Sequence, residues 1–350
     1  MYNIILGYIT AFTLTFFAIP SIIKIAKAKH LYDEPGERRV HKENTPSLGG
    51  IAIFAGLIFS IVLWTPFKEF SALQYIICAF LIIFLIGAKD DIIPLDPSKK
   101  LIGQLMAAMI LIFKSDIRLT SFYGMFGIYE ISDWLSIVLT IFTFIVIMNS
   151  LNLIDGINGL AGSISLIVCL VFGTWFFLID RIELAIVAYA TAGAVTAFLR
   201  YNLATAQIFM GDTGSLLLGL VGAILAIEFI EANLTLEQQP YAIHAAPAVA
   251  FGVLIIPLFD TLRVFTTRML RGRSPFRADR NHIHHLLLDM GFSHSSATAC
   301  LAIVNILMVV LVFELGYWPT LHLFLLILGI AGLLSGSLFY LVVKKRRQLQ

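Results

Sequence analysis

Residues 4–23 read IILGYITAFTLTFFAIPSII, twenty consecutive residues without a charged side chain. At about 1.5 Å per residue, a helix of this length spans the roughly 30 Å hydrocarbon core of a bilayer. No basic segment precedes the run and no small-residue cleavage site follows it. We therefore expect a retained transmembrane helix rather than a signal peptide.

Ten further apolar runs follow, and together they predict a polytopic membrane protein. The 350-residue chain is 59% hydrophobic and 13% charged, whereas soluble domains carry about 25% charged residues. Inside lipid, helices and closed barrels alone satisfy every backbone polar group, and we interpret these runs as helices. We expect a single all-α transmembrane catalytic domain over 1–350, with about eleven transmembrane helices at roughly 4–23, 48–65, 71–88, 101–113, 134–150, 160–179, 183–199, 214–230, 247–266, 296–313 and 320–343.

The basic residues predict the orientation of these helices. The net charge of +2 gives no reason to expect a nucleic-acid partner. The segments between runs, assigned alternately to the two sides and counted together with Arg263 near the end of the run 247–266, carry twenty Lys and Arg on one side and four on the other. Cytoplasmic loops carry such an excess, so the N-terminus is predicted outside and the C-terminus in the cytoplasm. The predicted cytoplasmic segments are about 24–47, 89–100, 151–160, 200–213 and 267–295.

Unusual polar residues gather in these cytoplasmic segments, beginning with the adjacent Asp90 and Asp91. A solvated turn would explain the nearby Pro94 and Asp96. Two carboxylates against the end of an apolar helix are costly at the membrane boundary and are usually functional. They can hold Mg²⁺ together with phosphate oxygens, or accept a proton.

Two further segments carry polar groups beside glycines. In NSLNLIDGINGLAG, residues 149–162, the Asn and Asp side chains recur every third position and share one helical face. In FMGDTGS, residues 209–215, Asp212 lies between two glycines before an apolar run. It could cap that helix, or the segment could approach a phosphate closely. The acidic segments on the same side favour a metal role for Asp212.

The fifth segment, RGRSPFRADRNHIHHLLLDMGF at residues 271–292, combines arginines with histidines. Ordinary topogenic charge, anionic lipid headgroups and a zinc site are alternatives, but no suitably spaced cysteine or acidic ligand supports zinc. We favour an anion clamp for a diphosphate, because guanidinium groups bind phosphate through paired N–H bonds.

Together the five segments resemble the polyprenyl-phosphate N-acetylhexosamine-1-phosphate transferase family, glycosyltransferase family 4, over about residues 30–295 and in matching order. Within it, the chain is most similar to the bacterial branch that transfers GlcNAc-1-phosphate to undecaprenyl phosphate. The resemblance implies an enzyme of the bacterial cytoplasmic (inner) membrane, with its active site on the cytoplasmic face. It would use a UDP-N-acetylhexosamine and undecaprenyl phosphate, release UMP and start a lipid-linked envelope polysaccharide such as O-antigen or teichoic acid. The resemblance leaves open whether the protein forms a homodimer.

The resemblance also implies roles for individual residues. Asp212 and Asn152 match positions that hold Mg²⁺, for which Mn²⁺ can substitute. Asp90 and Asp91 match a catalytic acidic pair near the acceptor phosphate. The matching substrate-binding positions are Lys100 for phosphate, Leu48, Gly49, Asp155, Asn158 and Phe209 for uridine, and Arg280, His282, His284 and His285 for the diphosphate and amino sugar.

Two departures and three alternatives bear on this interpretation. Asn158 stands where many bacterial members carry aspartate, so it is a poor candidate for a catalytic acid. The His-Ile-His-His order disfavours MurNAc-pentapeptide, although that substrate and deoxyhexosamines stay open. An anion transporter would place charges in mid-helix, whereas Asp260 and Glu228 lie near the ends of apolar runs. An inactive scaffold is disfavoured because both acidic segments are intact.

Overall fold

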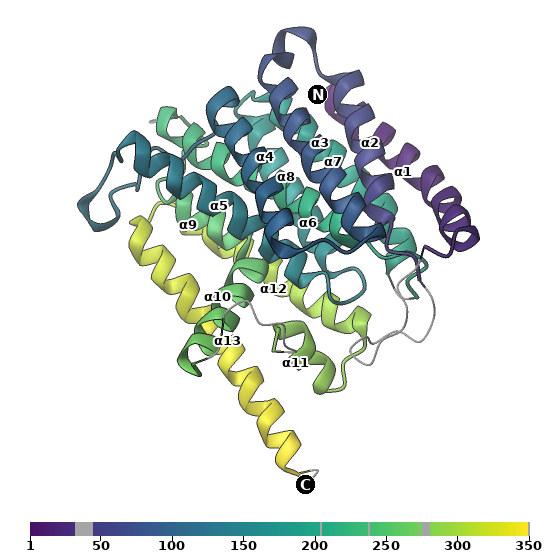
Figure 1. Ribbon diagram of the computed structural model, residues 1–350. Helices are drawn as coiled ribbons and strands as arrows, with labels where there is room; N and C mark the ends of the chain where they lie inside the picture. The colour runs from purple at the N-terminus through teal and green to yellow at the C-terminus, as the bar shows by residue number, and fades with distance from the viewer. Residues whose placement is uncertain (32–44, 204, 237–238, 273, 275–280, 349–350) are drawn as a thin grey trace.

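The computed structural model describes residues 1–31, 45–203, 205–236, 239–272, 274 and 281–348, without the side chains of 71 and 72 (Figure 1). Within these residues the structure is helical, with one isolated antiparallel bridge between Ser121 and Glu130. The α-helices are α1 (Tyr2–Ala28), α2 (Gly49–Trp64), α3 (Phe70–Ile92), α4 (Pro97–Ser115), α5 (Asp133–Ile154), α6 (Leu160–Leu178), α7 (Ile182–Asn202), α8 (Gly211–Thr235), α9 (Ala246–Val253), α10 (Ile255–Leu270), α11 (Ile283–Asp289), α12 (His294–Glu314) and α13 (Thr320–Gln348).

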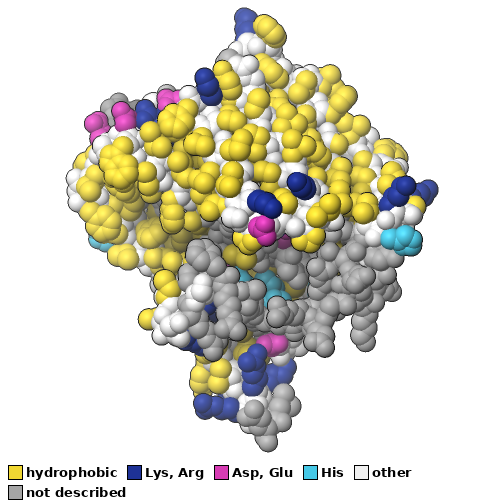
Figure 2. All heavy atoms as spheres, in the orientation of Figure 1, with side chains coloured by type: hydrophobic (Ala, Val, Ile, Leu, Met, Phe, Trp, Pro, Cys, Tyr) yellow, Lys and Arg dark blue, Asp and Glu magenta, His cyan; other side chains and the backbone are white. Residues whose placement is uncertain are grey.

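All eleven apolar runs are helical, which confirms an all-α polytopic architecture. In the described part of the chain, seven helices are long and apolar enough to span a bilayer, and the bent pair α9–α10 makes an eighth. The number of eleven spans stays a prediction, because α2 is shorter and neither α3 nor α4 is among these eight. Figure 2 shows apolar side chains over the broad middle of one face, with charged side chains at its rim and below.

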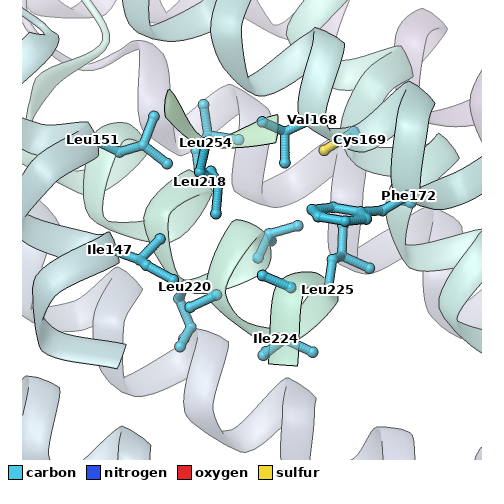
Figure 3. Close-up of a cluster of buried hydrophobic side chains, with 14 of the residues drawn as sticks. Ile147, Leu151, Val168, Cys169, Phe172, Leu218, Leu220, Ile224, Leu225 and Leu254 are labelled. Carbon is cyan, nitrogen blue, oxygen red and sulfur yellow. The ribbon is translucent and has the colours of Figure 1, made fainter. Parts of the chain in front are cut away.

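Helix α8 forms the centre of the bundle. It packs against α2, α3, α5 and α6, and nearly all of its apolar residues are buried. Figure 3 shows Leu218 and Leu225 of α8 among Ile147 and Leu151 of α5 and Phe172 of α6. This burial fixes the position of the N-terminal end of α8, where the FMGDTGS segment lies.

The run 247–266 is not one straight helix. It breaks at Leu254, and α9 and α10 meet at 86°. The bend directs α10 against α5 and α12. The chain then reaches α11, a seven-residue helix that begins within residues 282–285, which we call the histidine segment. The sequence placed Asp260 near the end of a run; the structure instead buries it inside α10, because the break divides the run.

Candidate active site

The acidic residues, Lys100 and Asn152 meet where four helix ends converge. Asp90 and Asp91 are in the last turn of α3, and Lys100 is in the first turn of α4. Asn152 belongs to the last turn of α5, and Asp212 to the first turn of α8. The sequence placed Asp90 and Asp91 against the end of a helix and Asn152 on a helical face, which agrees with these bounds, but it ended the apolar runs short of these residues. The helices continue past the apolar runs, so each side chain has a fixed direction.

Lys100 joins two of these carboxylates. Its Nζ lies 2.6 Å from Asp90 Oδ2 and 2.7 Å from Asp212 Oδ2. The other oxygen of Asp90 accepts the backbone N–H of Leu95 at 2.7 Å, which closes the turn between α3 and α4. Burial lowers the pKa of Lys100, but its hydrogen bonds to the two carboxylates outweigh burial and raise that pKa above its usual value. Lys100 is therefore a permanent cation between the two acids.

Asp91 instead holds the start of α8. Its Oδ1 accepts the backbone N–H of Asp212 at 2.7 Å, and its Oδ2 accepts both the backbone N–H of Thr213 at 3.0 Å and the Thr213 hydroxyl. Burial raises the pKa of Asp91 to about 7, although these hydrogen bonds favour its charged form. Gly211 has φ +74°, and a Cβ there would stand 2.6 Å from an Asp91 oxygen. Asp91 thus fixes the position of Asp212 at the start of α8.

Helix α3 approaches α8 closely enough to allow these bonds because it carries a glycine at the crossing. A Cβ added to Gly87 would stand only 2.4 Å from Thr213 Cα. The side chains of Asp90 and Asp91 therefore reach Lys100 and the α8 terminus from one short turn.

Asn152 and Asp155 approach Asp212 from α5. Asn152 Nδ2 donates to Asp212 Oδ1 at 3.1 Å and to Ser215 Oγ at 2.8 Å. Asp155 follows at the C-terminal end of α5. Burial raises the pKa of Asp155 to about 7, and repulsion from Asp212 and Asp91 adds to this rise. Four carboxylates thus share one region, those of Asp90, Asp91, Asp155 and Asp212, and Lys100 bridges two of them.

This donor set fits a hard divalent cation. Carboxylate and amide oxygens are the protein ligands that Mg²⁺ takes, and it binds through one or two carboxylates plus substrate phosphates. Among the described residues, no three acidic, histidine or cysteine side chains form a complete metal cage. Repulsion from Asp212 and Asp91 contributes to the raised pKa of Asp155, and a cation placed among these groups would lower that pKa. Asp212 and Asn152 could therefore hold Mg²⁺ with phosphate oxygens completing its shell, provided that the Asn152 amide turns its oxygen inward.

The residues predicted to bind uridine are brought together only in part. Gly49 N–H donates to the Phe209 carbonyl at 2.9 Å, and Phe209 N–H donates to the Pro46 carbonyl at 2.8 Å, so Leu48 and Gly49 lie beside the FMGDTGS segment. Asn158 is 5% exposed, and its carbonyl accepts the hydroxyl of Thr298 on α12 at 2.8 Å. Asn158 is thus tied to the α12 side of the site.

The histidine segment lies against the end of α5. His284 is 2% exposed, and a Cβ added to Gly156, next to Asp155, would stand 2.5 Å from His284 Nε2. The rings of His284 and His285 are 4.3 Å apart. Burial lowers the pKa of His284 to about 3, and repulsion from His285 adds to this effect, so its ring is neutral at pH 7. Arg280, which the sequence also assigns to this group, lies outside the described residues.

Two polar features here were missed from the sequence. The first is the hydrogen bond of 2.8 Å between Asp260 and His282. In the sequence, Asp260 stands out only as the single acidic residue of an apolar run. Gln104 and Asn149 pair through their amides at 2.8 and 3.3 Å, one turn from Lys100 and Asn152 along α4 and α5. Gln104 is 1% exposed, so this pair joins the two helices below the site.

Known proteins match this chain over most of its length. The model of glycosyl transferase family 4 matches residues 73–230. The undecaprenyl-phosphate alpha-N-acetylglucosaminyl 1-phosphate transferase of Escherichia coli K12 is 31% identical over 281 residues, 78% of this chain and 73% of that protein. The Yersinia pestis protein of that name is 29% identical, covering 91% of this chain and 87% of its own length. The decaprenyl-phosphate N-acetylglucosaminephosphotransferase of Mycobacterium tuberculosis H37Rv is 30% identical, covering 82% and 76%. With the acidic helix ends and the histidine segment assembled in one place, these matches show that the chain belongs to glycosyl transferase family 4.

Proposed function

We propose that this enzyme transfers GlcNAc-1-phosphate from UDP-GlcNAc to undecaprenyl phosphate and releases UMP. The observation that carries the proposal is the placement of Lys100 between Asp90 and Asp212, with Asn152 beside them. The names of the relatives support a polyprenyl phosphate acceptor and an N-acetylglucosamine phosphate group.

In the proposed reaction, an oxygen of the acceptor phosphate attacks the phosphorus that carries the sugar. The bond from that phosphorus to the oxygen bridging it to UMP breaks, and UMP leaves with that oxygen. Both reactants are anionic, so the protein must mainly position them and neutralise their charge. Mg²⁺ at Asp212 and Asn152 would supply positive charge to the diphosphate and to the departing UMP.

The chain's own residues then divide the remaining tasks. Lys100, a cation at the start of α4, binds the acceptor phosphate at the membrane boundary. Asp90 holds the Lys100 ammonium in place, and Asp91 fixes the helix start that carries Asp212. The acceptor phosphate is ionised at neutral pH, so no side chain has to remove a proton from it. The acidic pair thereby acts through Lys100 and Asp212.

The donor is proposed to lie between the FMGDTGS segment and the histidine segment. Uridine would contact Leu48, Gly49, Phe209, Asp155 and the side chain of Asn158, whose backbone carbonyl is held by α12. His282, His284 and His285, with Arg280, would cover the diphosphate and the amino sugar. Histidine and arginine N–H groups bind phosphate oxygens through charge-assisted bonds.

We place the enzyme in the bacterial inner membrane with this site facing the cytoplasm. The twenty-to-four distribution of Lys and Arg supports that orientation. It also puts the site where a cytoplasmic nucleotide sugar and a membrane lipid phosphate meet. The product would start a lipid-linked envelope polysaccharide.

One assay tests the proposal. Purified enzyme is incubated with Mg²⁺, undecaprenyl phosphate and one of a panel of UDP-sugars, and both UMP and the lipid product are measured. We expect UMP and lipid product in equal amounts with UDP-GlcNAc, and much less with UDP-MurNAc-pentapeptide. Preference for another UDP-sugar would refute the assigned donor, and UMP release without lipid product would refute the transfer.

A further inference from the structure

A buried carboxylate beyond the helix bend holds the start of the histidine segment. Asp260 of α10 is 1% exposed. Its Oδ2 lies 2.8 Å from His282 Nδ1, and its Oδ1 accepts the backbone N–H of Ile283 and a guanidinium N–H of Arg263, each at 3.0 Å. The same guanidinium nitrogen donates to the Asn281 carbonyl. One side chain thus fixes both the backbone and the ring at the entry to α11.

The partners of Asp260 indicate what its charge is for. A carboxylate this deeply buried is stable only where hydrogen bonds and opposite charges compensate for its lost hydration. Apolar residues of similar volume usually stabilise a fold as well as such a charge or better, so stability alone does not explain Asp260. The partners here are Arg263, one turn away, and residues 282 and 283. The charge therefore sets the geometry of the histidine segment.

The contact has a specific consequence for His282. Because Asp260 takes a hydrogen bond from Nδ1, the imidazole keeps its proton there, and Nε2 is the nitrogen available for another partner. The His282 ring is nearly parallel to that of His284, with centroids 5.7 Å apart. His284 in turn lies against Gly156, next to Asp155. A continuous series of contacts thus runs from Asp260 to the acidic site.

We propose that Asp260 is a positioning residue for the nucleotide sugar: it orients His282 and anchors the histidine segment over the end of α5. This inference rests on the proposed function, in which that segment binds the donor diphosphate. Asp260 itself touches no substrate. Its removal should therefore weaken donor binding while leaving acceptor binding, which depends on Lys100, nearly unchanged.

The test compares Asp260→Asn, His282→Asn and the double variant with wild type in detergent. The Asn at 260 keeps the volume and removes the charge, whereas the Asn at 282 can still donate to Asp260 but lacks the distal ring nitrogen. Equilibrium binding of radiolabelled UDP-GlcNAc with Mg²⁺ is measured, as are the Michaelis constants for UDP-GlcNAc and undecaprenyl phosphate. Asp289→Asn is the matched control, because Asp289 ends the same short helix in an exposed ion pair.

We expect Asp260→Asn to raise the donor dissociation and Michaelis constants at least about tenfold, the scale of one charge-assisted hydrogen bond. The acceptor constant should stay within about twofold, and the double variant should weaken donor binding by less than the product of the two single effects, since both substitutions act in part through one ring. Donor and acceptor constants that rise together, or effects that add, would overturn the inference.

Two further outcomes separate the inference from the function on which it rests. If wild type binds UDP-GlcNAc and Asp260→Asn binds it equally well, the inference is overturned but the proposed function is not. Wild type that does not bind UDP-GlcNAc refutes the proposed donor and the inference with it. If Asp260→Asn does not fold, unchanged donor binding in His282→Asn still overturns the inference, because Asp260 would then have no donor-binding ring to position.

Discussion

Replacing Asp91 with asparagine should destabilise the protein, whereas the same change at Asp90 should have a small effect on stability. Asp91 accepts two backbone N–H groups and one hydroxyl at the start of α8. An asparagine in the same place presents one oxygen and turns its NH₂ group against the remaining donors. Asn at 90 can still accept the Leu95 N–H, and Lys100 keeps its contact with Asp212.

The size of the effect follows from the bonds lost. A buried donor left without a partner costs about 1–3 kcal/mol. Burial of the Asp91 charge, which raises its pKa to about 7, offsets the gain from charge-assisted bonds. We therefore expect Asp91→Asn to lower the free energy of unfolding by about 1–3 kcal/mol. Asp90→Asn loses one of two contacts to a lysine that keeps the other, so we expect about 1 kcal/mol or less.

The assay is thermal unfolding in detergent, followed by intrinsic fluorescence, together with transfer activity. For a chain of this size about 2 °C per kcal/mol is expected, so the apparent Tm should fall by roughly 2–6 °C in Asp91→Asn and by about 2 °C or less in Asp90→Asn. Both variants should lose most activity, since one displaces Asp212 and the other removes one of the two carboxylates that hold Lys100 in place. Equal apparent Tm values for the two variants would contradict the division of roles between these aspartates.

Four other results are expected. Chelation with EDTA should abolish transfer and added Mg²⁺ restore it, and Asp212→Asn should stay inactive with excess Mg²⁺; full turnover in EDTA would exclude the metal role. In a background without native cysteines, a cysteine at the exposed position Ser98 should be shielded from an impermeant reagent in intact cells, and one at Tyr129 should be labelled; the reverse pattern would invert the predicted orientation. Arg280→Lys, predicted from the sequence, should raise the UDP-sugar KM at least about tenfold if paired N–H bonds hold the diphosphate, and a wild-type KM would leave that arginine a topogenic charge. His284 has a folded pKa of about 3, below the roughly 6.5 of an unfolded histidine, so the unfolded state takes up a proton first as the pH falls. The free energy of unfolding therefore decreases below about pH 6.5, by about 2 kcal/mol at pH 5. His284→Gln should accordingly show a smaller drop in apparent Tm between pH 7 and pH 5 than wild type.

The helices themselves were predictable from the sequence. Every apolar run is helical, because in lipid the backbone of a spanning segment must satisfy its own hydrogen bonds, and an apolar run is enough to identify such a segment. The polar residues of the site were also predictable, since carboxylates next to long apolar runs are conspicuous. What the runs did not predict was where each helix ends, because α3 and α4 continue through charged residues once tertiary partners neutralise them.

The different roles of Asp90 and Asp91 were decided by tertiary structure. The two residues have the same side chain and adjacent positions, so no local pattern separates them. They differ because successive residues on a helix point about 100° apart, toward Lys100 in one case and toward the start of α8 in the other.

Asp260 shows the same limit over a longer distance. The sequence determined that one acid stands in the run 247–266, and that a histidine segment follows. Only the 86° break at Leu254 brings α10 to the start of α11, so that a carboxylate placed near the end of a spanning run becomes the buried partner of His282. Hydrophobicity is a property of each residue and can be read along the chain, whereas the partner of a buried charge depends on the direction in which each helix packs.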